Sequence, residues 1–307
     1  AWVLRKFMNI SGSEGLVAAG NIFMGMTESP VLIKNYLPTM NRSEIFLVMV
    51  SGMGTIAGSV MGTYIGMLGG TDPAAKVLFA THLLSASVMA VPGSIVLAKM
   101  LCPQTEEATD HVAISGKEKE NSNILDAISS GTVTGVKLMT NIAAMLLVFI
   151  SLVALANYIT EGVIGRYTGL NDWIVKITDG KAQGLTFQFI LGVITSPFMW
   201  LIGVPSQDIM LVGSLLGQKT ILNEFVAYFQ LQQWKDAGLF MYEKSILMST
   251  YILCGFANIS SIGILLGGLG VLAPEKRGLI SRIGVPAMIG GALVSVLSAT
   301  IIGMILG

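Results

Sequence analysis

Charged residues are scarce in this sequence. They make up 12% of the 307 residues, while hydrophobic residues make up 53%. Soluble domains carry about 25% charged residues, so the composition excludes an ordinary soluble protein and predicts an integral membrane protein. The 18 basic residues equal the 18 acidic ones in number, and this balance gives no reason to expect nucleic acid as a partner. The two cysteines, Cys102 and Cys254, lie far apart and predict no disulfide framework.

The sequence also lacks the patterns of a catalytic site. It contains no Ser/His/Asp set, no cluster of metal ligands and no glycine-rich phosphate loop. Glu28 and Glu224 lie in apolar surroundings and offer an acid pair, but nothing near them supplies a nucleophile. We therefore expect that the protein is not an enzyme and uses no cofactor beyond a coupling ion.

A polar stretch at residues 20–30 interrupts the apolar sequence near its beginning. A carboxylate in hydrocarbon costs roughly 2.5–3.5 kcal/mol on insertion scales, so Glu28 is expected to face a wet cavity lined by protein. The apolar arms at 15–24 and 29–37 are too short to cross about 30 Å of hydrocarbon. Two short helical arms joined by a polar tip at 25–28 predict a re-entrant hairpin.

A second stretch of this kind follows about two hundred residues later. Short arms at 207–217 and 225–232 flank a polar tip at 218–224 that ends in Glu224. Two polar, helix-breaking insertions are the best sequence indication of a transporter's binding site. Lys219 is the one cation at either tip. The site therefore suits a neutral, hydroxyl-rich solute better than a phosphate or carboxylate.

Each hairpin precedes a long uncharged segment that small and polar residues interrupt. The segment 45–71 contains the run 51–59, and the segment 245–274 contains the run 255–263. Such runs either let helices pack closely or unwind to turn carbonyl and hydroxyl groups toward a ligand, and the sequence leaves both readings open. The acid and the break are separated by a similar length in both halves, which predicts an internal, inverted repeat with a site between its halves.

The expected fold is therefore an all-α membrane protein, a multi-span helical transporter with two re-entrant hairpins and two broken helices. Residues 124–137 are expected to form an interfacial helix, 138–160 a spanning scaffold helix and 161–181 a polar loop. The chain begins at Ala1 without a signal-peptide pattern, so we expect an N-terminal part to be missing. The predicted parts are a first transport repeat (1–101), a polar loop (102–123), the interfacial and scaffold helices (124–181) and a second transport repeat (182–307).

The motifs at the tips and breaks resemble those of the concentrative nucleoside transporter family over essentially the whole chain. The resemblance implies a secondary active symporter that imports nucleosides with Na+ or H+ by elevator-type alternating access. It also implies a homotrimer in the lipid bilayer of the bacterial inner membrane, with about three further N-terminal helices. The motifs are G-N-x-F-x-G-x-T-E-x-P at 20–30, G-S-V at 58–60, N-E-F-V-A-Y at 223–228 and C-G-F-A-N-x-S-S-x-G at 254–263.

The resemblance further implies roles for individual residues. Glu224 is similar to the family's ribose-binding acid, and Asn258 and Ser261 are similar to its ribose-binding pair. Thr27 and Glu28 lie where the family meets the nucleobase. The family's substrate-binding positions correspond to Met26, Thr27, Glu28, Val60, Glu224, Phe256, Asn258 and Ser261. Its sodium site corresponds to the side chains of Asn21 and Thr55 and the main-chain carbonyls of Met24 and Ile56, and such oxygen ligands suit a hard cation.

One residue departs from the family pattern. Met26 stands where members commonly have Gln, and a thioether cannot make the directional hydrogen bonds of an amide. Recognition of the base is therefore expected to differ, and the substrate remains open between a nucleoside, a modified nucleoside and another neutral hydroxylated solute. Proton coupling through Glu28 or Glu224 remains open beside sodium coupling. A channel is the alternative from another class, because re-entrant hairpins with polar tips also build pores.

Overall fold

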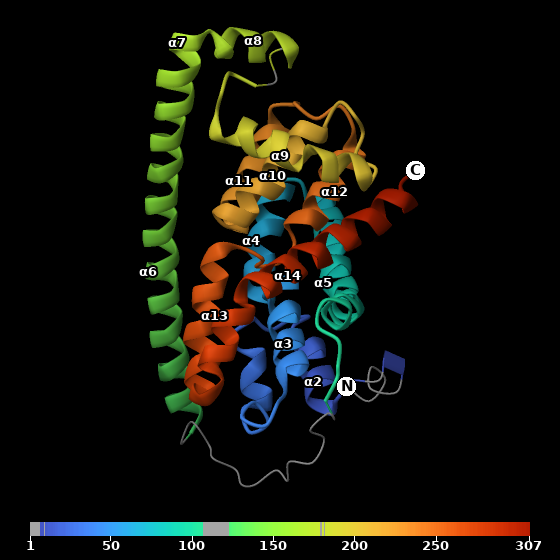
Figure 1. The fold of residues 1–307 in the computed structure, drawn as a ribbon, viewed down its shortest axis with the longest axis vertical. Helices are drawn as coiled ribbons and strands as arrows, with labels where there is room; N and C mark the ends of the chain where they lie inside the picture. Colours follow the sequence, from blue (N-terminus) through green and yellow to red (C-terminus); the bar gives the residue numbers. More distant parts are fainter. Residues whose placement is uncertain (1–6, 9, 107–122, 179, 181) are drawn as a thin grey trace. The chain divides into compact units, whose positions relative to one another are not determined.

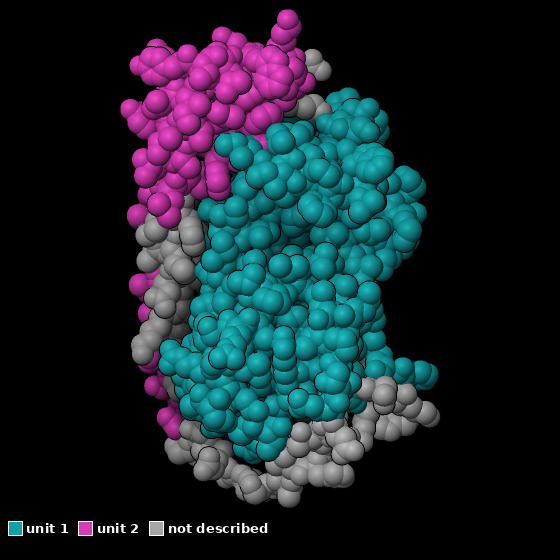
Figure 2. All heavy atoms as spheres, viewed as in Figure 1, with its two compact units in different colours: residues 1–112, 190–307 teal, residues 113–189 magenta. Residues whose placement is uncertain are grey.

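The computed structural model describes all residues except 1–6, 9, 107–122, 179 and 181, and the described residues form helices without any strand (Figure 1). The chain separates into two compact units (Figure 2). Unit 1 contains residues 1–112 and 190–307, and unit 2 contains residues 113–189. The all-helical fold predicted from the sequence is therefore confirmed, while the re-entrant placement of its hairpins in a membrane stays a prediction. Most of the predicted loop at 102–123 lies outside the described residues.

The first hairpin of unit 1 consists of α2 (Gly12–Gly20), a series of turns and the 3-10 helix η1 (Ser29–Ile33). Ser11 begins α2 through a capping box with Glu14, which satisfies two free N–H groups. The helix ends four residues earlier than the predicted arm at 15–24, and the second arm is 3-10 rather than α-helical. Gly20 and Gly25 favour this early end, because glycine is a poor helix former, and the Ser29 hydroxyl donates to the Asn21 Oδ1 at 2.6 Å across the turns.

The second hairpin consists of α10 (Ile209–Ile221) and α11 (Glu224–Asp236). Its tip is shorter than the predicted tip at 218–224, because α10 continues as far as Ile221. Lys219 therefore lies in the last turn of a helix. Asn223 starts α11 by accepting a hydrogen bond from the Val226 N–H at 2.9 Å.

Both long uncharged segments are broken helices. The first consists of α3 (Arg42–Gly54) and α4 (Gly58–Gly69), and the second of α12 (Glu243–Leu253) and α13 (Ile259–Leu272). Of the two readings that the sequence left open, the unwound turn is present in each. The small residues also serve close packing, since a Cβ on Gly255 would lie 2.9 Å from the carbonyl groups that end α3.

Two long helices complete the core of unit 1, α5 (Pro73–Leu101) and α14 (Arg277–Ile305), the latter preceded by the 3-10 turn η3 (Pro274–Lys276). A Cβ on Gly291 of α14 would lie 2.7 Å from the Met53 Cβ, so small residues let α14 approach α3 closely. His82 of α5 shares a hydrogen bond of 3.1 Å with the Tyr251 hydroxyl of α12. Within the described residues, three stretches are long and apolar enough to span a membrane: Arg42–Gly69, Pro73–Leu101 and Pro274–Ile305.

Unit 2 corrects two of the predictions. A single helix, α6 (Ile124–Asn157), replaces the interfacial helix at 124–137 and the separate scaffold helix at 138–160, because no proline interrupts this stretch. The predicted loop at 161–181 is largely helical, in η2 (Tyr158–Gly165, a π-helix), α7 (Arg166–Thr168) and α8 (Leu170–Ile177). Apolar residues in α8 recur at helical spacing, which explains the helix. The helix α9 (Phe187–Leu201) leads from unit 2 back into unit 1.

Candidate functional site

A buried carboxylate cluster joins the second hairpin to the second broken helix. The Asn258 Nδ2 donates to the Glu224 Oε2 at 2.9 Å. The Asn258 Oδ1 accepts from the Ser261 N–H at 2.9 Å and from the Ser260 hydroxyl at 2.6 Å. Glu224 is 8% exposed and Asn258 is 2% exposed. The structure thus brings together three residues that the sequence predicted, Glu224, Asn258 and Ser261. We define the carboxylate cluster as Tyr64, Glu224, Asn258, Ser260 and Ser261.

The local fold explains why these side chains meet. Glu224 is the first residue of α11, and Asn258 is the N-cap of α13. Helix N-termini carry free N–H groups and a partial positive charge, so they favour a nearby carboxylate. Since the bond between Glu224 and Asn258 links two such termini, both helix ends favour the carboxylate.

Tyr64 of α4 is the member of the carboxylate cluster that sequence reasoning missed. Its hydroxyl donates to the Glu224 Oε1 at 3.4 Å, and its ring stacks on the Tyr228 ring with centroids 4.1 Å apart. The one available signal was that a tyrosine inside an apolar span needs a partner for its hydroxyl. The contact attaches the first broken helix to the binding acid of the second hairpin.

A second buried polar group, the hydroxyl cluster, joins the first hairpin to the first broken helix. The Asn21 Nδ2 donates to the Ser51 Oγ at 2.9 Å, and the Thr55 hydroxyl donates to the Ser51 carbonyl at 2.9 Å. The structure thus brings together the two predicted sodium-binding side chains, Asn21 and Thr55. Sequence reasoning missed Ser29 and Ser51 as their partners. We define the hydroxyl cluster as Asn21, Ser29, Ser51 and Thr55, each at most 1% exposed.

The predicted carbonyl ligands belong to the two segments that meet at this cluster. The Gly58 N–H donates to the Phe23 carbonyl at 2.9 Å, which holds the turn containing Met24 against the break containing Ile56. Amide, hydroxyl and carbonyl oxygens are ligands that suit an alkali cation. The described residues contain no group of three or more His, Cys, Asp or Glu that could hold a metal ion.

The first tip behaves differently from the second. Met26 is buried. A Cβ added to Gly52 of α3 would lie 2.9 Å from the Met26 Cβ, so the base of the Met26 side chain packs closely against α3. Thr27 and Glu28 are exposed. The Glu28 Oε2 accepts from the Gly25 N–H at 2.9 Å and so closes its own turn. Among the described residues, no hydrogen bond joins Glu28 to Glu224. The other two predicted substrate-binding residues, Val60 and Phe256, are half-buried.

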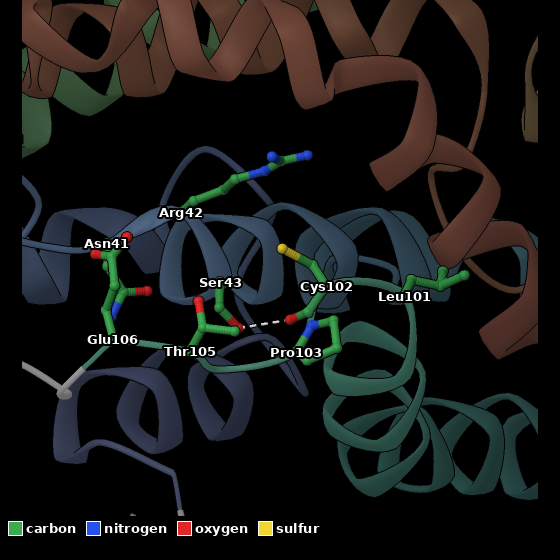
Figure 3. Close-up of a pocket in the computed structure, with 8 residues that line it drawn as sticks. All are labelled: Asn41, Arg42, Ser43, Leu101, Cys102, Pro103, Thr105 and Glu106. Carbon is green, nitrogen blue, oxygen red and sulfur yellow. Dashed lines mark hydrogen bonds between the residues drawn. The ribbon is translucent and has the colours of Figure 1, made fainter.

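A pocket opens elsewhere in unit 1, where α3 begins and α5 ends (Figure 3). The Ser43 hydroxyl donates to the Cys102 carbonyl at 2.7 Å across it. None of the predicted site residues lines this pocket, and we assign it no part in function. It is lined by Asn41, Arg42, Ser43, Leu101, Cys102, Pro103, Thr105 and Glu106.

Comparison with known proteins agrees with this architecture. Residues 82–303 match the family described as Na+ dependent nucleoside transporter C-terminus, and residues 1–71 match the family described as nucleoside recognition. An uncharacterized transporter of Haemophilus influenzae is 39% identical over 99% of this chain and 68% of its own length. Sodium/nucleoside cotransporter 1 of Rattus norvegicus is 39% identical over 99% of this chain and 46% of its own length.

Solved structures show the same fold. The structure of CNTnw in an inward-facing substrate-bound state has a TM-score of 0.84 and 36% identity, over 98% of this chain and 66% of that one. A doubly substituted CNTnw in an outward-facing state has a TM-score of 0.86, over 98% of this chain and 68% of that one. The fold shared with these structures and the family match define a membrane transporter. The chain belongs to the Na+ dependent nucleoside transporter family, and it spans between about half and about two thirds of the length of these relatives.

Proposed function

We propose that this chain forms the substrate- and ion-binding part of a symporter that imports nucleosides by alternating access, with Na+ as the coupling ion. The observation that carries the proposal is the buried bond between Asn258 and Glu224. In the structure the Glu224 carboxylate accepts hydrogen bonds from Tyr64 and from Asn258, and the backbone N–H of the same residue also bonds to it. A carboxylate has about four acceptor positions, so capacity remains for ribose hydroxyls. A solute without these hydroxyls would leave buried acceptors unpaired and be rejected.

The hydroxyl cluster is the proposed sodium site. Its contacts suggest how ion binding affects the substrate. The turns that follow Asn21 carry Thr27, and a Cβ added to Gly268 of α13 would lie 3.3 Å from the Thr27 Cγ2. Since Asn258 is the N-cap of α13, a cation that orders the first tip also supports the helix that presents the ribose-binding pair. Such coupling is reciprocal, so bound nucleoside should raise the affinity for sodium.

Uptake of radiolabelled uridine into proteoliposomes tests the proposal. The full-length protein that contains this chain is reconstituted, and sodium and proton gradients are imposed in turn. We expect accumulation against the uridine gradient with inward sodium and no accumulation with protons alone. Accumulation with protons alone would contradict the coupling ion, and equilibration without accumulation would indicate a channel. Competition by nucleosides, bases and sugars then separates a nucleoside from another hydroxylated solute.

Asn21→Ala is expected to raise the sodium concentration for half-maximal uridine uptake by about tenfold. The change removes one amide oxygen and two hydrogen bonds of the hydroxyl cluster, and each bond contributes about 1 kcal/mol. Uridine uptake at a series of sodium concentrations measures the effect. Ser59→Ala is the control, because it removes an exposed hydroxyl beside the same break and should leave the sodium requirement within twofold. An unchanged requirement in Asn21→Ala would remove Asn21 from the site.

The proposal includes a homotrimer in the bacterial inner membrane, which the resemblance to the family supports. Light scattering of the detergent-solubilised full-length protein, corrected for bound detergent, should give the mass of three copies.

A further inference from the structure

Lys219 is a completely buried cation that the proposed transport cycle does not use. It lies in the last turn of α10 and is 0% exposed. Its Nζ donates to the Ile252 carbonyl at 2.8 Å and to the Ser295 hydroxyl at 3.0 Å. The Ser295 hydroxyl in turn donates to the Cys254 carbonyl at 2.5 Å. Among the ion pairs of the described residues, none includes Lys219.

A buried ammonium with no carboxylate within ion-pair distance needs hydrogen-bonding partners as well, since its desolvation costs several kcal/mol. The end of α12 supplies them. This helix ends at Leu253, and the last carbonyls of a helix have no partner within it and carry partial negative charge. Lys219 binds one of these carbonyls directly, and it reaches the Cys254 carbonyl through Ser295. The interaction therefore lies at the start of the break that leads to Asn258.

The first repeat contains a related connection with different chemistry. Asn21 follows the first arm of its hairpin and bonds to Ser51 near the end of α3. Lys219 lies at the end of the first arm of the second hairpin and bonds near the end of α12. Each residue ties its hairpin to the first half of the neighbouring broken helix. The first repeat makes this tie with oxygen-rich groups that suit a free cation, whereas the second makes it with a cation of the chain itself.

We propose that Lys219 is the built-in cation of the second broken helix and a positioning residue for the substrate site. Its ammonium holds the carbonyls at Ile252 and Cys254, so that the break at 254–258 keeps Asn258 and Ser261 in place beside Glu224. Lys219 itself does not touch the substrate. The proposal rests on the proposed function in one respect only, the identification of Glu224, Asn258 and Ser261 as a nucleoside-binding site.

Hydrogen exchange without nucleoside tests the positioning role directly. The full-length protein and its Lys219→Met variant, which keeps the length of the side chain without its charge, are compared in nanodiscs at fixed NaCl by mass spectrometry. We expect amide exchange in peptides over 254–261 to rise about tenfold, while peptides over 51–60 stay within twofold. Unchanged exchange at 254–261, or an equal rise in both segments, would overturn the proposal. Lys276→Met is the matched control, since Lys276 also donates to a carbonyl, that of Met40 at 2.8 Å, away from this break.

Uridine binding measured by calorimetry gives the functional readout. We expect Lys219→Met to weaken binding at least tenfold and Lys276→Met to leave it within twofold. If Lys219→Met fails to fold, Ser295→Ala replaces it, because that change keeps the cation and removes its link to Cys254. It should weaken binding about threefold with faster exchange at 254–261, and wild-type behaviour in a folded Ser295→Ala protein would overturn the proposal. If the wild-type protein binds no uridine but Lys219→Met still exchanges faster at 254–261, the nucleoside assignment is refuted and the positioning role of Lys219 is supported.

Discussion

Glu224→Gln is expected to reduce sodium-driven uridine uptake by about a hundredfold. Hydrogen bonds to a charged group contribute about 1.5–3 kcal/mol each. A neutral amide would bind the ribose hydroxyls without this charge-assisted contribution. The amide also replaces acceptor positions with donors, which cannot receive a bond from a hydroxyl in the same orientation. The loss should therefore fall mainly on substrate binding, with a smaller rise in the sodium requirement through the coupling between the two sites.

The protein should remain folded, because glutamine can satisfy the partners that Glu224 has in the structure. Its carbonyl oxygen can accept from the Asn258 amide, and its amide can donate to the Tyr64 oxygen. Glu243→Gln is the matched control, since Glu243 is likewise the first residue of a helix, α12, but is exposed. Initial uptake rates in proteoliposomes and size-exclusion profiles measure the two effects. Uptake of Glu224→Gln within threefold of wild type would contradict the assignment of the site.

The sequence identified the groups whose chemistry conflicts with apolar surroundings. Glu224 and Asn258 are polar residues inside long hydrophobic segments, so each indicated a site before any contact was known. The breaks beside them were predictable for a related reason, because glycine and asparagine interrupt helices and cap new ones. Their meeting in the carboxylate cluster agrees with the predicted repeat, since each hairpin bonds to the break of its own half.

Residues whose role depends on a distant partner were not predictable. Tyr64 and Glu224 are 160 positions apart, and nothing in the local sequence of α4 indicates that they meet. Ser51 looked like one of many small residues in its run, although it bonds both Asn21 and Thr55. Lys219 appeared to belong to a polar tip, whereas the structure places it inside a helix with its charge directed at α12. Tertiary contacts, which a single sequence does not contain, decide these cases.

Gly255 lies where the two broken helices touch. Its φ is +126°, a conformation that side chains with a Cβ rarely adopt. A Cβ at this position would lie 2.9 Å from the carbonyl carbon and oxygen of Gly54 and equally close to the carbonyl oxygen of Met53. These are backbone atoms at the end of α3, so the neighbour cannot move aside by rotating a side chain. The contact brings the break beside the carboxylate cluster against the break beside the hydroxyl cluster.

Gly255→Ala is therefore expected to destabilise the protein by about 3 kcal/mol, the sum of backbone strain and overpacking. The apparent melting temperature in detergent should fall by roughly 6 °C or more, as measured by the loss of the size-exclusion peak after heating. Gly263→Ala is the control, since a Cβ there meets nothing within 4 Å in α13 and should leave stability unchanged or raise it by roughly 0.5–1 kcal/mol. Equal melting temperatures for Gly255→Ala and wild type would contradict the close contact.

The functional effect of Gly255→Ala should also differ in kind from those of the site variants. Asn21→Ala changes the sodium requirement, and Glu224→Gln changes the handling of uridine. Because Gly255 separates the two breaks by backbone contact alone, an added methyl group displaces α3 and α12 together. In protein that still folds, the affinity for uridine should fall and the sodium requirement should rise. This combined effect would indicate that Gly255 acts through the packing of the two breaks and not through a ligand contact. A change in only one of the two quantities would mean that the breaks move independently.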